Sequence, residues 1–226
     1  MSSRSQATRP RRTPLSRQRV LRAAVALADE RGAEGLTMRK LATELGVEAM
    51  SLYNHVASKE DLLDGMVDIV FGEIDFSSDS PDWKAAMRQR AIATRNALLR
   101  HRWATGLMES RTSPGPESFR VHDAVLGCLR RAGFSLEMTV HAYSAQDAYI
   151  YGFALQEKTL VFDTSDEGAA EAARQMQEFE AVLADYPHLV EVVGGHVAKA
   201  GYNFDAEFLF GLDLILDGLD RLRGRN

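Results

Sequence analysis

Residues 36–63 read LTMRKLATELGVEAMSLYNHVASKEDLL, two short helical patterns separated by a Gly-Val dipeptide. Thr37 is a favourable N-cap for the first pattern, and Gly46 is typical of the residue that follows a helix. The first helix is therefore predicted to run through Leu45, and the second over roughly residues 48–55. Two short helices joined by a tight, glycine-containing turn form a helix-turn-helix arrangement.

Neither short helix is long enough to be stable alone, so the arrangement needs flanking helices. The preceding segment places apolar residues at helical spacing behind Ser16, a predicted N-cap, and Gly32 ends it. The following helix is predicted to start after Ser58, at a sequence close to a capping box, and to run to Ile74. The sequence therefore predicts three helices around a small core and a fourth that leads away from them.

The second short helix exposes side chains that suit a DNA groove. They have modest bulk and hydrogen-bonding groups, which fit a major groove about 12 Å wide. Two cations flank the same face near helix starts, where a phosphate would be favoured. The predicted DNA contacts are Arg39, Ala49, Met50, Ser51, Tyr53, Asn54, His55 and Lys59. The pattern is also compatible with a purely structural helical subdomain, in which Tyr53 packs inside and His55 lies on the surface.

Charge is distributed unevenly along a chain whose net charge is -5. Residues 1–61 contain 11 Lys and Arg against 7 Asp and Glu, whereas the remainder contains 16 against 25. Seven arginines and no acidic residue precede Ala23, which indicates a polyanionic partner for the front end alone. Residues 1–14 lack large apolar side chains and are predicted to be a disordered basic arm. On charge alone, a solvated tail without a partner explains this arm equally well.

The rest of the chain also has helical spacing. Residues 75–82 (DFSSDSPD) form a polar, turn-rich break, the best candidate for a domain boundary. The sequence has no strand alternation, internal repeat or coiled-coil heptads, so the fold class is predicted to be all-α. Further helices are predicted over residues 83–101, 103–110, 117–132, 136–158, 171–184, 189–200 (interrupted by Gly194 and Gly195) and 204–222.

Composition and motifs exclude several other classes of protein. Cys128 is the only cysteine, so no intramolecular disulfide or cysteine-rich zinc site is expected. The sequence shows no secretory signal and no apolar run near the ~20 residues of a membrane span, which predicts a soluble cytoplasmic protein. The six histidines lack metal-ligand spacing, and no nucleophile-elbow, dinucleotide or phosphate-loop motif occurs. No metal, cofactor or enzymatic activity is therefore predicted.

The second part of the chain mixes aromatic and polar residues on segments that are predicted to pack together. Such a mixture suits a largely apolar ligand pocket with a few orienting polar groups, although core packing explains most of these residues equally well. Gln146 and Asp147 are the stronger candidates, because a buried polar group on an otherwise apolar helix costs about 1–3 kcal/mol unless it is paired. The candidate pocket residues are Trp103, Met108, Phe119, His122, Tyr143, Gln146, Asp147, Tyr149, Ile150 and Phe153.

The segment from Ser16 to Asp64 resembles the DNA-binding domain of TetR-family transcriptional regulators. The resemblance rests on LTMRKLATELGV, on the Leu-Tyr-x-His-Val ending and on the Lys-x-x-Leu-Leu that follows. The segments DWKAAMRQRAIATRNALLRHRW, LRRAGFSLE and FLFGLDLILDGLDRL are similar to the C-terminal domain of the tetracycline-repressor branch. Together these segments span most of residues 16–222.

This resemblance implies an all-helical homodimer that represses transcription and releases DNA when a small molecule binds its C-terminal domain. It also implies the eight DNA contacts given above, position by position. In the family, the last helix and the helix over residues 136–158 pair across a two-fold axis, and both are apolar enough here to do so. A dimer would place two recognition helices about 34–36 Å apart, which matches successive major grooves. The implied dimer contacts are Phe208, Leu212, Ile215 and Leu219.

The sequence departs from the tetracycline repressor at the positions that bind the drug. The repressor holds a magnesium–tetracycline complex with histidine, asparagine, threonine and glutamine side chains, and none of the matching residues here has that chemistry. Those residues are Asp75, Arg90, Met108, Arg111 and Val125. Tetracycline is therefore not a supported effector. Asn54 replaces an aromatic residue and Ala49 replaces a glutamine in the recognition helix, so the operator is expected to differ as well.

The sequence as a whole predicts a ligand-responsive transcriptional repressor that binds a palindromic DNA operator as a dimer and is released by a small-molecule effector. Residues 15–74 would form the helix-turn-helix DNA-binding domain with its connecting fourth helix, and residues 75–226 the larger ligand-binding and dimerisation domain. Three alternatives remain: a helical enzyme that uses the same pocket, a transcriptional activator of the same fold, and an architectural or protein-interaction module. An enzyme would turn over the bound ligand, and a module would bind DNA without sequence preference or not at all.

Overall fold

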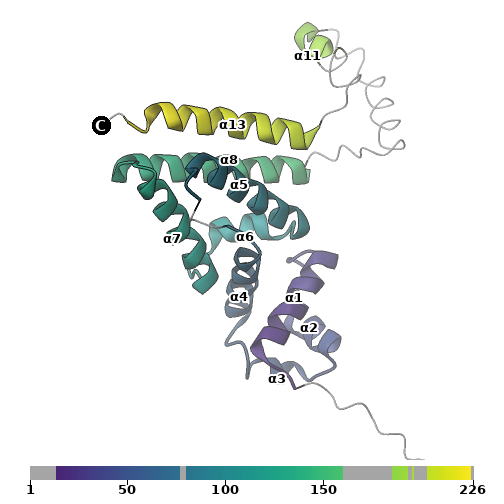
Figure 1. The fold of residues 1–226 in the computed structure, drawn as a ribbon. Helices are drawn as coiled ribbons and strands as arrows, with labels where there is room; N and C mark the ends of the chain where they lie inside the picture. The colour runs from purple at the N-terminus through teal and green to yellow at the C-terminus, as the bar shows by residue number, and fades with distance from the viewer. Residues whose placement is uncertain (1–13, 77–79, 160–184, 193–194, 196–202, 225–226) are drawn as a thin grey trace, which may run out of the picture.

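The computed structural model describes residues 14–76, 80–159, 185–192, 195 and 203–224, and the regular elements within them are all helices (Figure 1). The predicted all-α class is therefore confirmed. None of these helices combines the length and the apolarity that crossing a bilayer requires. The helices are α1 (Arg17–Arg31), α2 (Met38–Leu45), α3 (Ala49–Leu52), α4 (Lys59–Gly72), α5 (Trp83–Arg100), α6 (Ala104–Ser110), α7 (Pro116–Arg131), α8 (Leu136–Thr159), α11 (Pro187–Val192) and α13 (Phe204–Leu222).

Helices α1 to α4 form an N-terminal unit whose helix ends follow the predicted caps. Ser16, Thr37 and Ser58 each begin a helix with a side-chain hydroxyl that accepts a backbone N–H. Gly46 ends α2 with a φ of 65°, a left-handed conformation that glycine adopts without the usual steric cost. The four helices then bury one apolar stripe each in a shared core, which includes Val20, Leu41, Leu52 and Leu62.

α3 is shorter than the helix predicted over residues 48–55. Its regular part covers only Ala49–Leu52, and the next three residues form a hydrogen-bonded turn. Two amides in this turn donate to carbonyls three residues earlier, at 3.3 and 2.8 Å. The tighter turn brings Leu52 and Val56 into the core, where they are 0% and 1% exposed. Burial of these two side chains explains why the regular helix stops early.

The remaining predicted helices agree with the structure to within two residues where the chain is described. α7 begins at Pro116, whose fixed φ suits the first position of a helix. The helix predicted over residues 171–184 lies outside the described residues, as does most of the one predicted over 189–200, whose first part falls in α11. The predicted basic arm also lies outside them, apart from Pro14.

α4 connects the N-terminal unit to a larger helical body (Figure 1). It packs against α1 within the unit and against α6 and α7 in the body. Within the body, α5 packs on α8 and α13, and α7 packs on α8. Trp83 at the start of α5 meets the ring of Phe134 edge-on at 4.9 Å, which anchors α5 against the turn between α7 and α8. α4 therefore belongs to both parts of the molecule.

Arg95 joins α5, α8 and α13 in the interior of the body. Its guanidinium donates two hydrogen bonds to Glu157, at 2.8 and 2.6 Å, and one to Asp205 at 2.7 Å. The rings of Phe153 and Phe208 lie 5.7 and 5.0 Å from the same cation. Two further ion pairs run from α5 to α13. α13 is therefore fixed on its own chain through one face.

The inward face of α13 carries three of the four predicted dimer contacts. Phe208, Leu212 and Leu219 are 0%, 0% and 7% exposed within a single chain, so their own chain covers most of their surface. Helical spacing identifies an apolar stripe but not the neighbour that covers it. Ile215 is half-buried, and the four contacts stay a prediction. The large exposed apolar residues of α8 and α13 include Leu136, Val140, Leu155, Phe210 and Leu214.

Candidate nucleic-acid interface and ligand cavity

The predicted DNA contacts all have side chains at or near the surface of the N-terminal unit. Met50 and Tyr53 are 74% and 44% exposed, which is high for side chains of their apolar area. Arg39, Asn54 and Lys59 are exposed as well, whereas Ala49, Ser51 and His55 are partly buried. All eight side chains are therefore at least partly accessible to a partner.

Arg17 on α1 fixes the turn that follows α3. Its guanidinium binds Asp61 through two hydrogen bonds of 2.8 and 2.6 Å and donates a third, of 3.1 Å, to the carbonyl oxygen of His55. Asp61 also accepts the amide of Ala57 at 2.8 Å. These bonds join α1, the turn and α4, so they set the position of α3. Sequence reasoning counted Arg17 only among the front-end arginines, because a partner 44 residues away leaves no local signal.

Replacing Asp61 with asparagine is expected to lower the melting temperature by about 2–4 °C at neutral pH, equivalent to about 1 kcal/mol. The hydrogen bonds from Arg17, and then the one from Ala57, lower the pKa of Asp61. A lowered folded-state pKa gives stability that is fully present above the ordinary value of about 3.9 and is lost as the pH falls below it. Calorimetric melting from about pH 7 to about pH 3 should therefore show the gap between the wild type and Asp61→Asn closing in acid. Asp123→Asn, an exposed change on α7, is the control, and a gap that does not vary with pH would contradict this assignment.

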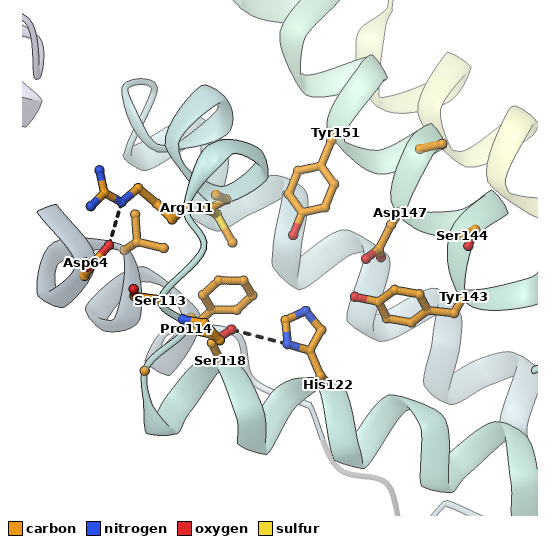
Figure 2. A pocket seen from close by; sticks show the side chains of 15 residues that line it. Asp64, Arg111, Ser113, Pro114, Ser118, His122, Tyr143, Ser144, Asp147 and Tyr151 are labelled. Atoms are coloured by element: carbon orange, nitrogen blue, oxygen red, sulfur yellow. Dashed lines mark hydrogen bonds and ion pairs between the residues drawn. The ribbon is translucent and has the colours of Figure 1, made fainter. Parts of the chain in front are cut away.

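A cavity of about 480 Å³ lies where α4 meets the larger body (Figure 2). Its wall is formed by α4, by the end of α6 and the loop that follows, by α7 and by α8. This volume is within the range of small-molecule sites, about 300–1,000 Å³. Four of the predicted pocket residues line it, namely Met108, His122, Tyr143 and Asp147.

Three other predicted pocket residues lie outside this cavity, on the same helices. Gln146 is fully buried, and its side-chain amide donates to the carbonyl of Ala142 at 3.2 Å. Ile150 is buried in the core, and Phe119 is 61% exposed on α7. Neighbouring residues of a helix point in different directions, which is why Asp147 lines the cavity while Gln146 does not.

The remaining predicted pocket residues hold helices together elsewhere. The indole N–H of Trp103 donates to Asp29 on α1 at 2.6 Å. The hydroxyl of Tyr149 donates to the carbonyl of Phe208 at 2.9 Å, and the two rings stack with centroids 5.5 Å apart. Phe153 lies against Arg95 and Phe208. Their aromatic bulk therefore serves packing, which the sequence pattern could not distinguish from ligand binding.

α4 and the loop after α6 supply part of the cavity wall that the sequence did not predict. Asp64, Val67 and Phe71 come from α4, which the sequence predicted only as a helix that leads away from the three-helix core. Of the five positions at which the sequence departs from the tetracycline repressor, Met108 and Arg111 line this cavity. The departures from the tetracycline repressor therefore indicated the loop after α6 as part of the site. Nothing in the sequence indicated α4, because the spacing of its apolar residues only predicts a buried stripe.

Polar groups gather on the α7 and α8 sides of the cavity. The hydroxyl of Ser118 lies 3.2 Å from Nδ1 of His122, whose ring centroid is 5.8 Å from that of Tyr143. Asp147 accepts a 2.5 Å hydrogen bond from the buried Arg90. Burial raises the pKa of Tyr143, and the charge of Asp147 and the hydrogen bond between the two raise it further, so the phenol is neutral.

Arg111, in the cavity wall, binds α4. Its Nε donates to Asp64 at 2.5 Å, and its two terminal nitrogens donate to the carboxylate and the backbone carbonyl of Glu60 at 2.6 and 3.2 Å. Asp68, one turn further along α4, accepts the amide of Ser118 at 3.0 Å. Glu60, Asp64 and Asp68 are spaced four residues apart and form one acidic stripe along α4. The larger body therefore holds α4 through this acidic stripe.

A second set of contacts joins the larger body to α1 and to the end of α4. Both ring nitrogens of His101 face carboxylates, with Nδ1 2.8 Å from Asp29 and Nε2 3.1 Å from Glu73. Trp103 also donates to Asp29, and Arg100 donates to Glu73. Burial opposes ionisation of Glu73, but the hydrogen bonds from Arg100 and His101 outweigh it and lower the pKa of Glu73. The N-terminal unit is thus attached at α1 as well as along α4.

Two adjoining parts of the chain match two descriptions of one protein family. Residues 20–66 match "Bacterial regulatory proteins, tetR family", and residues 77–223 match "Tetracyclin repressor-like, C-terminal domain". The chain belongs to the TetR family. The resemblance seen in the sequence is therefore confirmed, including its tetracycline-repressor branch, and α2 and α3 are the helix-turn-helix of a TetR-family domain.

Relatives of this TetR-family protein are named as regulators of transcription. An HTH-type transcriptional regulator of Saccharopolyspora erythraea is 33% identical, with 93% of this chain and 86% of the relative covered. The HTH-type transcriptional repressor DrrR1 of Streptomyces coeruleorubidus is 36% identical, with 95% and 82% covered. Such identity over nearly the whole length agrees with the predicted class of DNA-binding transcriptional regulator.

A solved TetR-family structure has the same arrangement of helices. It is ActR from Streptomyces coelicolor in complex with actinorhodin, with a TM-score of 0.75, 26% identity, and 94% of this chain and 100% of that chain covered. The likeness extends over the N-terminal unit and the larger body together. It therefore concerns the whole fold and not the helix-turn-helix alone.

Proposed function

We propose that this TetR-family protein is a homodimeric repressor that binds a palindromic operator through α3 and leaves it when a small molecule occupies the cavity. One observation carries this function: α4 starts beside α3, and its residues Asp64, Val67 and Phe71 line the cavity. A ligand there acts directly on the helix that positions α3. The names of the two relatives, a transcriptional regulator and a transcriptional repressor, support the same function.

The exposed side chains around α3 divide into two roles on DNA. Arg39 and Lys59 stand near the starts of α2 and α4, where free amides and positive charge favour phosphates. Ser51 and Asn54 carry hydrogen-bonding groups suited to base edges, and the exposed Met50 is suited to a thymine methyl group. The first pair supports affinity for any duplex, and the others support sequence preference.

The outward faces of α8 and α13 support dimerisation. Val140, Leu155, Phe210 and Leu214 are 52–66% exposed, although each is a large apolar side chain. Water contact with this much apolar surface is unfavourable, so a second copy that covers it would stabilise the protein. Two copies joined in this way present two α3 segments, which a palindromic operator requires.

The acidic stripe supplies the link between the cavity and α4. Arg111 lines the cavity and also donates three hydrogen bonds to Glu60 and Asp64. A ligand that displaces Arg111, or pushes against Val67, changes the position of α4 and so the separation of the two α3 segments. Effector and operator then weaken each other's binding by equal factors.

Selection from a random DNA pool tests the proposed function without knowledge of the effector. The purified full-length chain is incubated with the pool at low salt, and bound molecules are amplified and sequenced over several rounds. An inverted repeat with half-sites about one helical turn apart is expected. Absence of enrichment by a preparation free of co-purified small molecules would refute operator recognition. In a transcription assay on the selected site, a rise in transcript on adding the protein would assign activation instead of repression.

Lys59→Ala is expected to weaken binding to all DNA sequences and to reduce the slope of log K against log salt by about 1, because one phosphate contact is lost. Asn54→Ala is expected to cost about 1–3 kcal/mol on the selected operator and to relax preference at one base pair, with the slope unchanged. Fluorescence anisotropy at several salt concentrations, on operator and scrambled DNA, measures both quantities. An unchanged affinity and slope for Lys59→Ala would contradict the proposed docking.

A further inference from the structure

The surroundings of the cavity carry more acid than base. Asp64 and Asp147 stand in the wall with Arg111 as a cation. Among the described side chains bonded to the wall, Glu60 and Asp68 add carboxylates and Arg90 adds a guanidinium. Arg111 donates three hydrogen bonds to Asp64 and Glu60, whereas Arg90 donates one, to Asp147, and its buried Nε and Nη1 make no hydrogen bond. An anionic ligand would therefore meet an excess of negative charge, whereas a cation would be attracted.

Asp147 is the carboxylate placed to meet a ligand. Asp64 is bound by Arg111, and Asp68 by the amide of Ser118 at the start of α7. Asp147 is bound by Arg90 through one oxygen and also accepts the hydroxyl of Tyr143, and its side chain is 14% exposed in the wall of the cavity. A carboxylate accepts about four hydrogen bonds, so this group has capacity for a further donor.

Aromatic rings surround the space in front of Asp147. Figure 2 shows the side chains of Tyr143, Tyr151 and His122 directed toward the same space as the Asp147 carboxylate. The ring of Phe71 lies 5.3 Å from that of His122 and completes the wall on the α4 side. Ring faces attract cations, and a carboxylate among them binds the N–H groups of an ammonium.

We propose that the effector carries a protonated amine on an apolar body, and that Asp147 is the specificity-determining residue that binds the amine among these rings. This assignment rests on the cavity being the effector site of the proposed repressor. The apolar body occupies the rest of the cavity beside Val67, Phe71 and Met108, next to α4. The ligand class is therefore an organic cation with ring-sized apolar bulk.

A matched series of three small probes tests the assignment on the full-length chain. Naphthylmethylamine, naphthalenemethanol and naphthoate share one ring system and differ in charge, so calorimetry separates charge from bulk. The amine is expected to bind about ten- to a hundredfold more tightly than the alcohol, and naphthoate the most weakly. Asp147→Asn is expected to lower the affinity for the amine to that for the alcohol, and to leave the affinity for the alcohol unchanged. Asp123→Asn, which removes an exposed carboxylate of α7 outside the wall, should keep the preference.

Asp147→Asn could fail to fold, because it removes the partner of the buried Arg90. A second pair of variants tests the assignment without that change. Tyr151→Phe keeps the ring and should keep the preference for the amine, whereas Tyr151→Leu should lower it by about three- to thirtyfold. Four outcomes would each overturn the assignment. The amine and the alcohol could bind equally well, naphthoate could bind most tightly, no probe could bind, or the preference for the amine could survive Asp147→Asn.

The operator selection described above uses no probe, so the two inferences fail separately. An operator without amine preference refutes only the ligand class. Amine preference in a chain that enriches no operator supports the cavity chemistry and refutes the proposed repressor.

Discussion

Leu214→Glu is expected to convert the proposed dimer to monomers and to weaken operator binding by about 10²–10⁴-fold, because each half-site would then be bound independently. Leu214 is 59% exposed and lies one turn from Phe210, which is 66% exposed. Both are on the side of α13 that its own chain leaves uncovered, since Phe208 and Leu212 face inward. A charge at this position would be buried without a partner in any dimer that uses this face.

Analytical ultracentrifugation and anisotropy on the selected operator measure the two effects of Leu214→Glu. Ala26→Glu adds the same charge to an exposed position of α1 and serves as the control for oligomeric state. Circular dichroism should show unchanged helix content, because the substitution is on the surface of a single chain. A variant that remains a dimer would show that subunits associate through another surface.

Arg111→Ala is expected to weaken operator binding by about 5- to 150-fold while leaving non-specific DNA binding and its salt dependence unchanged, since this range is typical of coupling between sites. Arg111 is remote in sequence from α3 but donates three hydrogen bonds to Glu60 and Asp64 on the first turns of α4. Without them, the larger body holds the start of α4 less firmly, although Asp68 and Glu73 still bind it further along. The variant would therefore resemble the effector-bound state in the absence of effector.

A double-mutant comparison distinguishes this coupling role from a general loss of stability. Asp64→Asn should produce part of the same loss, and Arg111→Ala combined with Asp64→Asn should add little to Arg111→Ala alone. Arg120→Ala removes a partly exposed arginine that pairs with Glu117 on α7, and it should bind the operator normally. An equal loss on scrambled DNA, or full operator affinity for Arg111→Ala, would show that the acidic stripe has only a structural role.

Local signals predicted the helices of the N-terminal unit well. Thr37, Gly46 and Ser58 act on the backbone within a few residues, so their effect could be predicted without the tertiary fold. The end of α3 could not, because it depends on Leu52 and Val56 entering a core built by four helices. Arg17 was likewise assigned to the basic front end until the fold placed it on Asp61.

The cavity and the subunit contacts depended on packing that no periodicity reveals. α13 has apolar residues on two faces, and spacing alone did not show that Phe208 and Leu212 pack inside while Phe210 and Leu214 remain outside. The apolar side chains of α4 gave the same ambiguity, since Val67 and Phe71 serve the core and the cavity at once. Polar residues on otherwise apolar helices were a better guide to the cavity, as Asp147 shows. The sequence did not indicate, however, that Asp147 faces the cavity and its neighbour Gln146 does not.

Trp103 gives the molecule a spectroscopic reporter at the joint between its two parts. The chain has two tryptophans, and the other, Trp83, is packed on Phe134 inside the larger body. The indole of Trp103 is bonded to Asp29 on α1 and lies 6.0 Å from the ring of His101. Movement of α1 away from the body would break that bond and expose the indole to water, whereas Trp83 would keep its surroundings. A red shift of the intrinsic emission would thus report such a movement in real time, without any attached dye.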